Sequence, residues 1–288
     1  MNRLNIGASS YFSRPSHELD PHLFDGEHLK PHVRETINNL LMEYLDSRYH
    51  NASSYVMVWL AGSGISYQWA SDRGNGDLDV LFGIDYSKFV TDNPEFQYMD
   101  RQEITDAIDD DLKKNLWPYT SGMPFYIDNK EQYTSQRYEI TFFLNNNIED
   151  SPHAIVNIHP YAAYNVTEDM WTIKPPAPGD IPSEYPKEYE EKSQDNLRQA
   201  EQLVTRHGYL MQQLSMTPKN SPQWHNYQSS MTLLMQYIRT MYDEIHLGRK
   251  KAFSDNGEGY GDFYNYQWQA AKRDGIVNTL NEILNMEH

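Results

Sequence analysis

Two aspartates in the first third of the chain are the residues best suited to chemistry. Asp77 and Asp79 open the apolar run from Val80 to Ile84, which predicts a strand. Alternate residues of a strand face the same way, so we expect the two carboxylates to project side by side. Carboxylates placed in this way can share Mg²⁺ or Mn²⁺ ions, which normally keep phosphate oxygens of a substrate as further ligands. The pair therefore predicts a metal site that handles a phosphorylated substrate.

A glycine-serine turn precedes the aspartates. Gly62 and Ser63 follow the apolar run from Tyr55 to Leu60, which predicts a second strand. Glycine lets the backbone approach a phosphate closely, and the amides and hydroxyl around Ser63 can donate hydrogen bonds to its oxygens. An acidic pair alone is usually a solvated strand end, so the interpretation depends on the turn and the aspartates together.

Gly62-Ser63, a short spacer and Asp77-x-Asp79 on a strand together resemble the signature of the polymerase-beta-like nucleotidyltransferase superfamily. The resemblance covers roughly residues 31–165. It implies an α/β (α+β) core with a mixed sheet. It also implies that Asp77 and Asp79 bind the metals, and that Gly62 and Ser63 hold a nucleoside triphosphate such as ATP. A third carboxylate on a neighbouring strand completes the site in that family.

Two residues compete for the place of the third carboxylate. Glu139 lies in the run Arg137 to Leu144, which predicts a strand, and it would be the remaining metal ligand or the base that takes the acceptor's proton. The run Ala154 to His159 predicts another strand and resembles the family's third acidic strand with Asn157 at the acidic position. An amide cannot accept a proton and binds Mg²⁺ weakly, so that alignment would imply a repurposed site.

Helical patterns flank the predicted strands. Apolar residues at steps of three and four predict a helix over residues 31–49, with Pro31 suited to its first turn, and a further helix spans about residues 100–116. The nucleotidyltransferase core requires this order of elements: a helix, a strand, a turn and the strand that carries the aspartates. Any α/β domain shows the same alternation, but it gives no reason for the turn and the aspartates together.

The chain divides into three segments on composition. Residues 1–175 form the predicted catalytic domain, residues 176–186 a proline-rich connector, and residues 187–288 a helical domain. Two long periodic runs joined at residues 217–222 predict an antiparallel helical hairpin, and a third helix is expected from Tyr266 to Met286.

Basic residues of the helical domain are the expected partners of the triphosphate. In the family that the chain resembles, appended helical domains usually form the far wall of the nucleotide cleft. On that resemblance, Arg249 and Lys272 would contact the phosphates. The alternative is favourable charge near a helix end and on a solvated helix face.

Composition limits the partners. The net charge is −17, from 24 basic and 41 acidic residues, which disfavours binding of long nucleic acid but allows a nucleoside triphosphate held at close range by metals. The chain has no cysteine, so disulfides and thiolate sites are excluded. No apolar stretch has the length of a signal peptide core or a membrane span, so we expect a cytoplasmic protein without membrane contact.

The sequence thus predicts a metal-dependent nucleotidyltransferase that moves a nucleotidyl group from a nucleoside triphosphate to an acceptor and releases pyrophosphate. The acceptor stays open among a small molecule, an RNA end, a second nucleotide and a protein side chain. The alternative is a catalytically inactive relative that binds a nucleotide or a protein partner, and Asn157 in the third acidic position would favour it.

Overall fold

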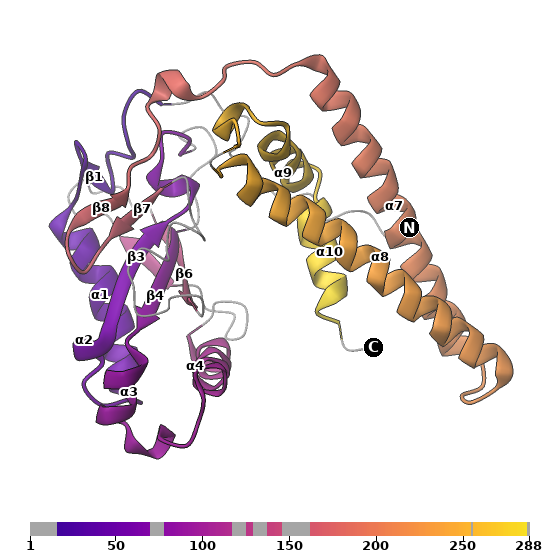
Figure 1. Cartoon of the computed structure of the whole chain (residues 1–288), viewed down its shortest axis with the longest axis horizontal. Coiled ribbons are helices and arrows are strands. Elements are labelled where there is room, and N and C mark those ends of the chain that lie inside the picture. The colour runs from indigo at the N-terminus through magenta and orange to yellow at the C-terminus, as the bar shows by residue number, and fades with distance from the viewer. Residues whose placement is uncertain are drawn as a thin grey trace. The chain divides into compact units, whose positions relative to one another are not determined.

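The computed structural model describes residues 16–69, 78–116, 125–128, 137–145, 162–254 and 256–286 (Figure 1). Asp77, Asn157 and the predicted strand Ala154–His159 lie outside these residues. The chain divides into two compact units between Asp180 and Ile181, within the proline-rich segment. The first unit is a mixed α/β structure and the second is helical, as the sequence predicts.

The α/β unit is built around a mixed sheet. Its described part has six strands in the order β5-β6-β4-β3-β7-β8. The helices and strands of this unit are, in chain order, β1 Phe24–Asp25, β2 His28–Leu29, α1 Pro31–Asp46, α2 Ala52–Tyr55, β3 Val56–Ala61, β4 Leu78–Ile84, α3 Tyr86–Asp92, α4 Arg101–Asn115, β5 Phe125–Asp128, β6 Arg137–Leu144, β7 Ala163–Asn165 and β8 Met170–Ile173. Short 3₁₀ turns lie at Ser63–Ile65, Pro94–Phe96 and Pro178–Asp180.

The central strands β3, β4 and β6 set the geometry of the sheet. β3 and β4 are antiparallel with Ala61 opposite Asp79, whereas β4 and β6 are parallel with Asp79 opposite Thr141. These strands are buried on both faces, which explains their nearly continuous apolar sequences. α4 contacts β6, and α1 contacts β5.

One face of the sheet carries both an apolar cluster and Asp79. Trp59, Ala61, Leu81 and Ala163 form the cluster, and each is at most 5% exposed. Asp79 lies on the same face because it is two residues from Leu81 in β4. The sheet therefore presents its aspartate at the edge of a closely packed layer.

Polar contacts tie the segment before α1 to the sheet. Tyr138 of β6 donates a hydrogen bond to Asp20 Oδ2 at 2.6 Å, and His22 Nδ1 lies 2.9 Å from Asp20 Oδ1. Burial, followed by this hydrogen bond to Asp20, raises the pKa of the Tyr138 hydroxyl well above its ordinary value. Trp171 of β8 donates to the carbonyl of Glu27 at 2.7 Å. The segment is thus fixed at both β6 and β8.

Local signals explain where the helices begin. Pro31 lies in the first turn of α1, which ends at Asp46 rather than at the predicted residue 49. Asp100 and Glu103 form a reciprocal capping box at the start of α4. The predicted helices over residues 31–49 and 100–116 and the predicted strand Arg137–Leu144 are confirmed.

The helical unit is an antiparallel hairpin with two shorter helices packed against it. Its helices are α7 Lys187–Met216, α8 Pro222–Ala252, α9 Phe263–Arg273 and α10 Ile276–Leu284, with a 3₁₀ turn at Gly259–Gly261. Apolar residues from all four helices share one core, including Val204, Leu210, Ile238, Ala271 and Leu280. Within the described residues, no helix combines the length and the apolar content needed to cross a membrane.

The prediction of one continuous helix from Tyr266 to Met286 is wrong. The chain forms α9 and α10 instead, separated at Asp274 and Gly275. Gly275 has a φ of +76°, and its amide donates to the carbonyl of Lys272 at 3.2 Å. Because a glycine takes up the left-handed conformation easily, it ends the first helix and starts the second in a new direction. The apolar periodicity continues across the break, which is why the pattern alone suggested one helix.

Candidate active site

The turn after β3 is built against the carboxylate of Asp79. Gly62 has a φ of +94°, a conformation that side chains rarely adopt. A β-carbon placed on Gly62 would lie 2.9 Å from Asp79 Oδ2 and 3.6 Å from Asp79 Cγ. The carboxylate therefore occupies the space that any other residue at position 62 would need. The structure brings together these two predicted site residues, which are 17 positions apart in the sequence.

Thr141 is the polar residue that the strand register places beside Asp79. The two residues are opposite each other in the parallel pair of β4 and β6, and Thr141 is only 8% exposed. The sequence analysis did not select Thr141, although it lies two positions after Glu139 in the predicted strand. Its hydroxyl can donate or accept a hydrogen bond beside the carboxylate.

The other predicted residues of this site are described in part. The backbone of Glu139 lies in β6, where it pairs with Tyr126 and comes two positions before Thr141. The backbone of Ser63 begins the short turn Ser63–Ile65. The side chains of Glu139 and Ser63, and all of Asp77, lie outside what the structure describes. Among the residues that it does describe, three or more acidic, histidine or cysteine side chains never gather closely enough to hold a metal.

Buried polar groups support the chain beyond the turn. Ser66 and Gln68 are at most 2% exposed, and the Gln68 amide donates to Ser66 Oγ at 3.1 Å. Trp69 Nε1 donates to the carbonyl of Glu18 at 2.8 Å, and the Ser16 amide donates to the carbonyl of Tyr67 at 2.7 Å. These contacts join the segment after Gly62 to residues that precede α1.

Arg249 and Lys272, the predicted triphosphate ligands, meet at one aromatic ring in the helical unit. The Arg249 guanidinium lies 5.2 Å and the Lys272 ammonium 5.9 Å from the centre of the Trp268 ring. Such cation–π contacts are attractive. His246 lies 5.5 Å from the same ring, and burial, followed by the charges of Lys250 and Arg249, lowers its pKa. Both cations therefore have a structural role on the surface of α8 and α9.

A second polar cluster joins α7 to α9. Tyr266 donates to Glu190 Oε2 at 2.5 Å, and Arg273 lies 3.4 Å from Glu190 and 2.7 Å from Asp274. The hydrogen bond from Tyr266 is the largest cause that lowers the pKa of Glu190. Burial and Glu190 together raise the pKa of Tyr266 to about 12. The cluster is a stabilising contact between two helices, because each of its charges has a partner within it.

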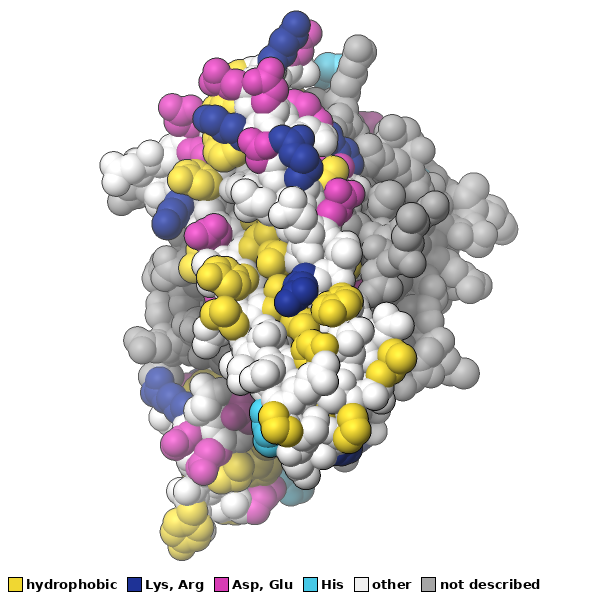
Figure 2. Space-filling model, turned by 90° about the vertical axis from the view of Figure 1, so that its right-hand side faces the viewer, with side chains coloured by type: hydrophobic (Ala, Val, Ile, Leu, Met, Phe, Trp, Pro, Cys, Tyr) yellow, Lys and Arg dark blue, Asp and Glu magenta, His cyan; other side chains and the backbone are white. Residues whose placement is uncertain are grey.

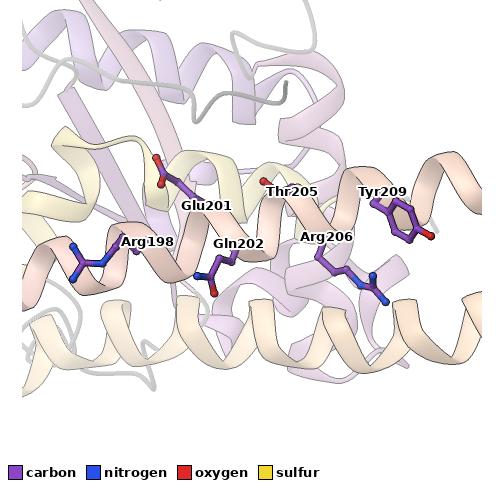
Figure 3. Close-up of a pocket in the computed structure, with 6 residues that line it drawn as sticks. All are labelled: Arg198, Glu201, Gln202, Thr205, Arg206 and Tyr209. Atoms are coloured by element: carbon purple, nitrogen blue, oxygen red, sulfur yellow. The ribbon is translucent and has the colours of Figure 1, made fainter.

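Two hollows are lined by described residues other than those of the Asp79 turn. One, of about 450 Å³, is next to the start of α1 and is lined by Glu18, Leu19, Pro21, Phe24, Asp25, Gly26, Lys30 and Pro31. The other, of about 550 Å³, follows α7 and is lined by Arg198, Glu201, Gln202, Thr205, Arg206 and Tyr209 (Figure 3).

The lining residues of the second hollow lie in two rows along successive turns of α7, with Arg198, Gln202 and Arg206 in one row (Figure 3). Arg198 pairs with Asp195, and the Arg206 guanidinium lies 5.2 Å from the centre of the Tyr209 ring. The two arginines therefore already have partners on their own helix.

Asp79, Gly62 and Thr141 are thus the described residues that form a candidate active site. A carboxylate held against a turn at the end of a strand can bind a divalent cation, and a glycine in such a turn leaves no side chain between its backbone and a phosphate. Comparisons of the chain with protein-family models, with curated proteins and with solved structures find no match.

Proposed function

We propose that the chain is a metal-dependent nucleotidyltransferase related to the polymerase-beta-like superfamily. The observation that carries the proposal is the contact between Gly62 and Asp79. A glycine with a φ of +94° leaves room for Asp79 Oδ2 where a β-carbon would otherwise lie. The glycine of the glycine-serine motif and the second aspartate of the Asp-x-Asp motif thus depend on each other for their conformations. If the two motifs occurred in the sequence by chance, there would be no reason for their residues to be in contact.

The residues at this place fit a hard divalent cation. Asp79 is half-buried and has its backbone fixed between β3 and β6, so its carboxylate is held in place before any ligand binds. In the proposal, Asp77 and Glu139 are the other ligands of Mg²⁺ or Mn²⁺. Two such ions, when bound, stabilise the attacking and leaving oxygens of the reaction.

The chain's own residues would position the reacting groups. The backbone around Gly62 and Ser63 would hold the triphosphate by amide hydrogen bonds. An oxygen of the acceptor would attack the α-phosphorus, the bond from that phosphorus to the β-phosphate oxygen would break, and pyrophosphate would leave. Glu139 would accept the proton of the acceptor hydroxyl. The roles of Arg249 and Lys272 as triphosphate ligands stay predictions, since Trp268 already gives both cations a contact.

Transfer of a labelled nucleotide tests the proposal directly. The purified chain is incubated with each of the four α-labelled ribonucleoside triphosphates and Mg²⁺ or Mn²⁺, in the presence of total tRNA, a cell extract or the chain alone. We expect label to move to one acceptor class. Asp79→Asn should lower the rate by roughly 10²-fold or more, as is typical when a preorganised electrostatic group of an active site is removed.

Asp180→Asn is the matched control, because it makes the same chemical change at an exposed residue of the same unit. It should leave transfer unchanged. Equal rates for the wild type and Asp79→Asn would refute the proposed mechanism. Binding of a triphosphate without transfer under every condition would favour the inactive, binding-only alternative.

A further inference from the structure

The density of charged residues along the helical hairpin falls sharply partway along α7. The first part of α7, from Lys187 to Arg206, has nine charged residues among 20. The next 32 residues, from 207 to 238, have one, Lys219. Charged residues make up 23% of the whole chain, so this stretch is strongly depleted. We call the described surface of residues 207–238 the neutral end of the hairpin.

The neutral end also exposes large apolar side chains. The exposed fractions are 53% for Leu233, 59% for Tyr237 and 72% for Met216, and Tyr209 and Met211 are each more than 40% exposed. In Figure 2, acidic and basic side chains crowd the upper part of the face, whereas hydrophobic and uncharged side chains surround a single basic one at its centre. Depletion of charge together with exposed tyrosine and methionine is the composition of a protein interface.

On α8 one regular line of residues is exposed, apart from the partly exposed Ser230. Asn226, Ser230, Leu233, Tyr237 and Thr240 are spaced by four, three, four and three residues. This spacing puts them on one stripe of the helix, away from the core positions Met231, Leu234 and Ile238. All of the stripe except Thr240 lies on the neutral part of α8, residues 222–238, which is about 25 Å long. Figure 1 shows that the tip of the hairpin extends past the end of α10, so a partner helix can reach this end.

Charge decides which partner fits. Nucleic acids and anionic membranes are held by clustered lysine and arginine, and the neutral end has a single lysine. A basic protein would be drawn to the acidic surface of a chain with a net charge of −17, not to its neutral part. Two copies of the same chain, each with a net charge of −17, repel each other overall. They meet with little repulsion only where the charge is close to zero on both.

We propose that the neutral end of the hairpin is a self-association surface through which two copies of the chain form a symmetric dimer. A two-fold interface buries the same patch on both subunits, so the patch must be compatible with itself. Neutral polar and apolar residues satisfy this condition. Leu233 and Tyr237 at the middle of the stripe are the central contacts, and the two hairpins pack as a four-helix arrangement.

The mass in solution tests this inference. Sedimentation or light scattering of the full chain in the micromolar range should give twice the chain mass of 33.8 kDa. Leu233→Glu/Tyr237→Glu puts like charges on both sides of the interface and should reduce the mass to that of one chain. Both side chains are more than half exposed, so the helical circular dichroism and the melting temperature should stay close to those of the wild type.

A charge-reversal mixture protects the test against a folding artefact. Leu233→Lys/Tyr237→Lys alone should also be monomeric, and mixing it with the glutamate variant should restore the dimer mass. Tyr98→Glu, a control at a residue that is 90% exposed in the α/β unit, should leave the dimer intact. A monomeric wild type, or a dimer that survives the glutamate substitutions, would overturn the proposal.

Discussion

Gly62→Ala measures how tightly the turn and the aspartate depend on each other. Two costs follow from the structure. A non-glycine residue in the left-handed region costs roughly 1–2 kcal/mol. The new β-carbon would also lie 2.9 Å from Asp79 Oδ2, which forces the carboxylate away from its preferred rotamer for roughly 0.5–1.5 kcal/mol more. We expect the free energy of unfolding to fall by about 1.5–3.5 kcal/mol.

Gly26→Ala separates the two costs. Gly26 has a φ of +61°, and its β-carbon would meet no atom within 4 Å, so only the backbone cost applies. Thermal unfolding followed by circular dichroism should show the larger decrease for Gly62→Ala, at roughly 2–4 °C per kcal/mol. Nucleotidyl transfer should fall with Gly62→Ala and stay unchanged with Gly26→Ala.

The double variant Gly62→Ala/Asp79→Ala checks the cause. Without the carboxylate, the two closest of these contacts are lost, and the β-carbon of residue 79 lies at an ordinary distance of 3.8 Å from the β-carbon of residue 62. The cost of the alanine at position 62 should therefore shrink to the backbone part in this background. Equal destabilisation by Gly62→Ala and Gly26→Ala in the wild-type background would refute the reasoning.

Two further predictions concern the helical unit. Because the pKa of Glu190 is lowered from its ordinary 4.5, its stabilising contribution is present above that value and is lost as the pH falls below it. Tyr266→Phe removes the largest cause of the lowered pKa, so thermal unfolding should show a stability loss at pH 7 that shrinks toward pH 3. Gly275→Ala places a side chain at a φ of +76° and should cost roughly 1–2 kcal/mol in urea unfolding. Gly179→Ala, at an open position without positive φ, is its control. A Tyr266→Phe loss that does not change with pH, or equal costs for the two glycine variants, would contradict these expectations.

The sequence predicted the strands that form the site, but not which residues of neighbouring strands lie beside Asp79. Apolar runs and alternation are local, so β3, β4 and β6 could be expected from the pattern. The need for glycine at position 62 could not be worked out in the same way, because it arises from the register that puts Ala61 opposite Asp79. Thr141 was missed for the same reason. Its place beside Asp79 depends on the pairing of strands that are far apart in the chain.

In the helical unit, tertiary packing gave residues partners that the sequence did not suggest. Arg249 and Lys272 lie on different helices, and the ring of Trp268 between them was not part of the prediction. The break at Gly275 had a local signal, a glycine within a helical pattern, but the apolar spacing on both sides of it favoured one helix.

The strand order also determines when the site can form as the chain folds. β3 and β4 are antiparallel neighbours separated by a short segment, so the contact between Gly62 and Asp79 closes a small loop. The parallel pairing of β4 with β6 must wait until α3, α4 and β5 have been made and the chain has returned to the sheet. Closing that longer loop costs more entropy and is slower. During synthesis, Asp79 therefore meets the turn first and Thr141 last, and until β6 arrives one edge of β4 is open to pairing with another chain.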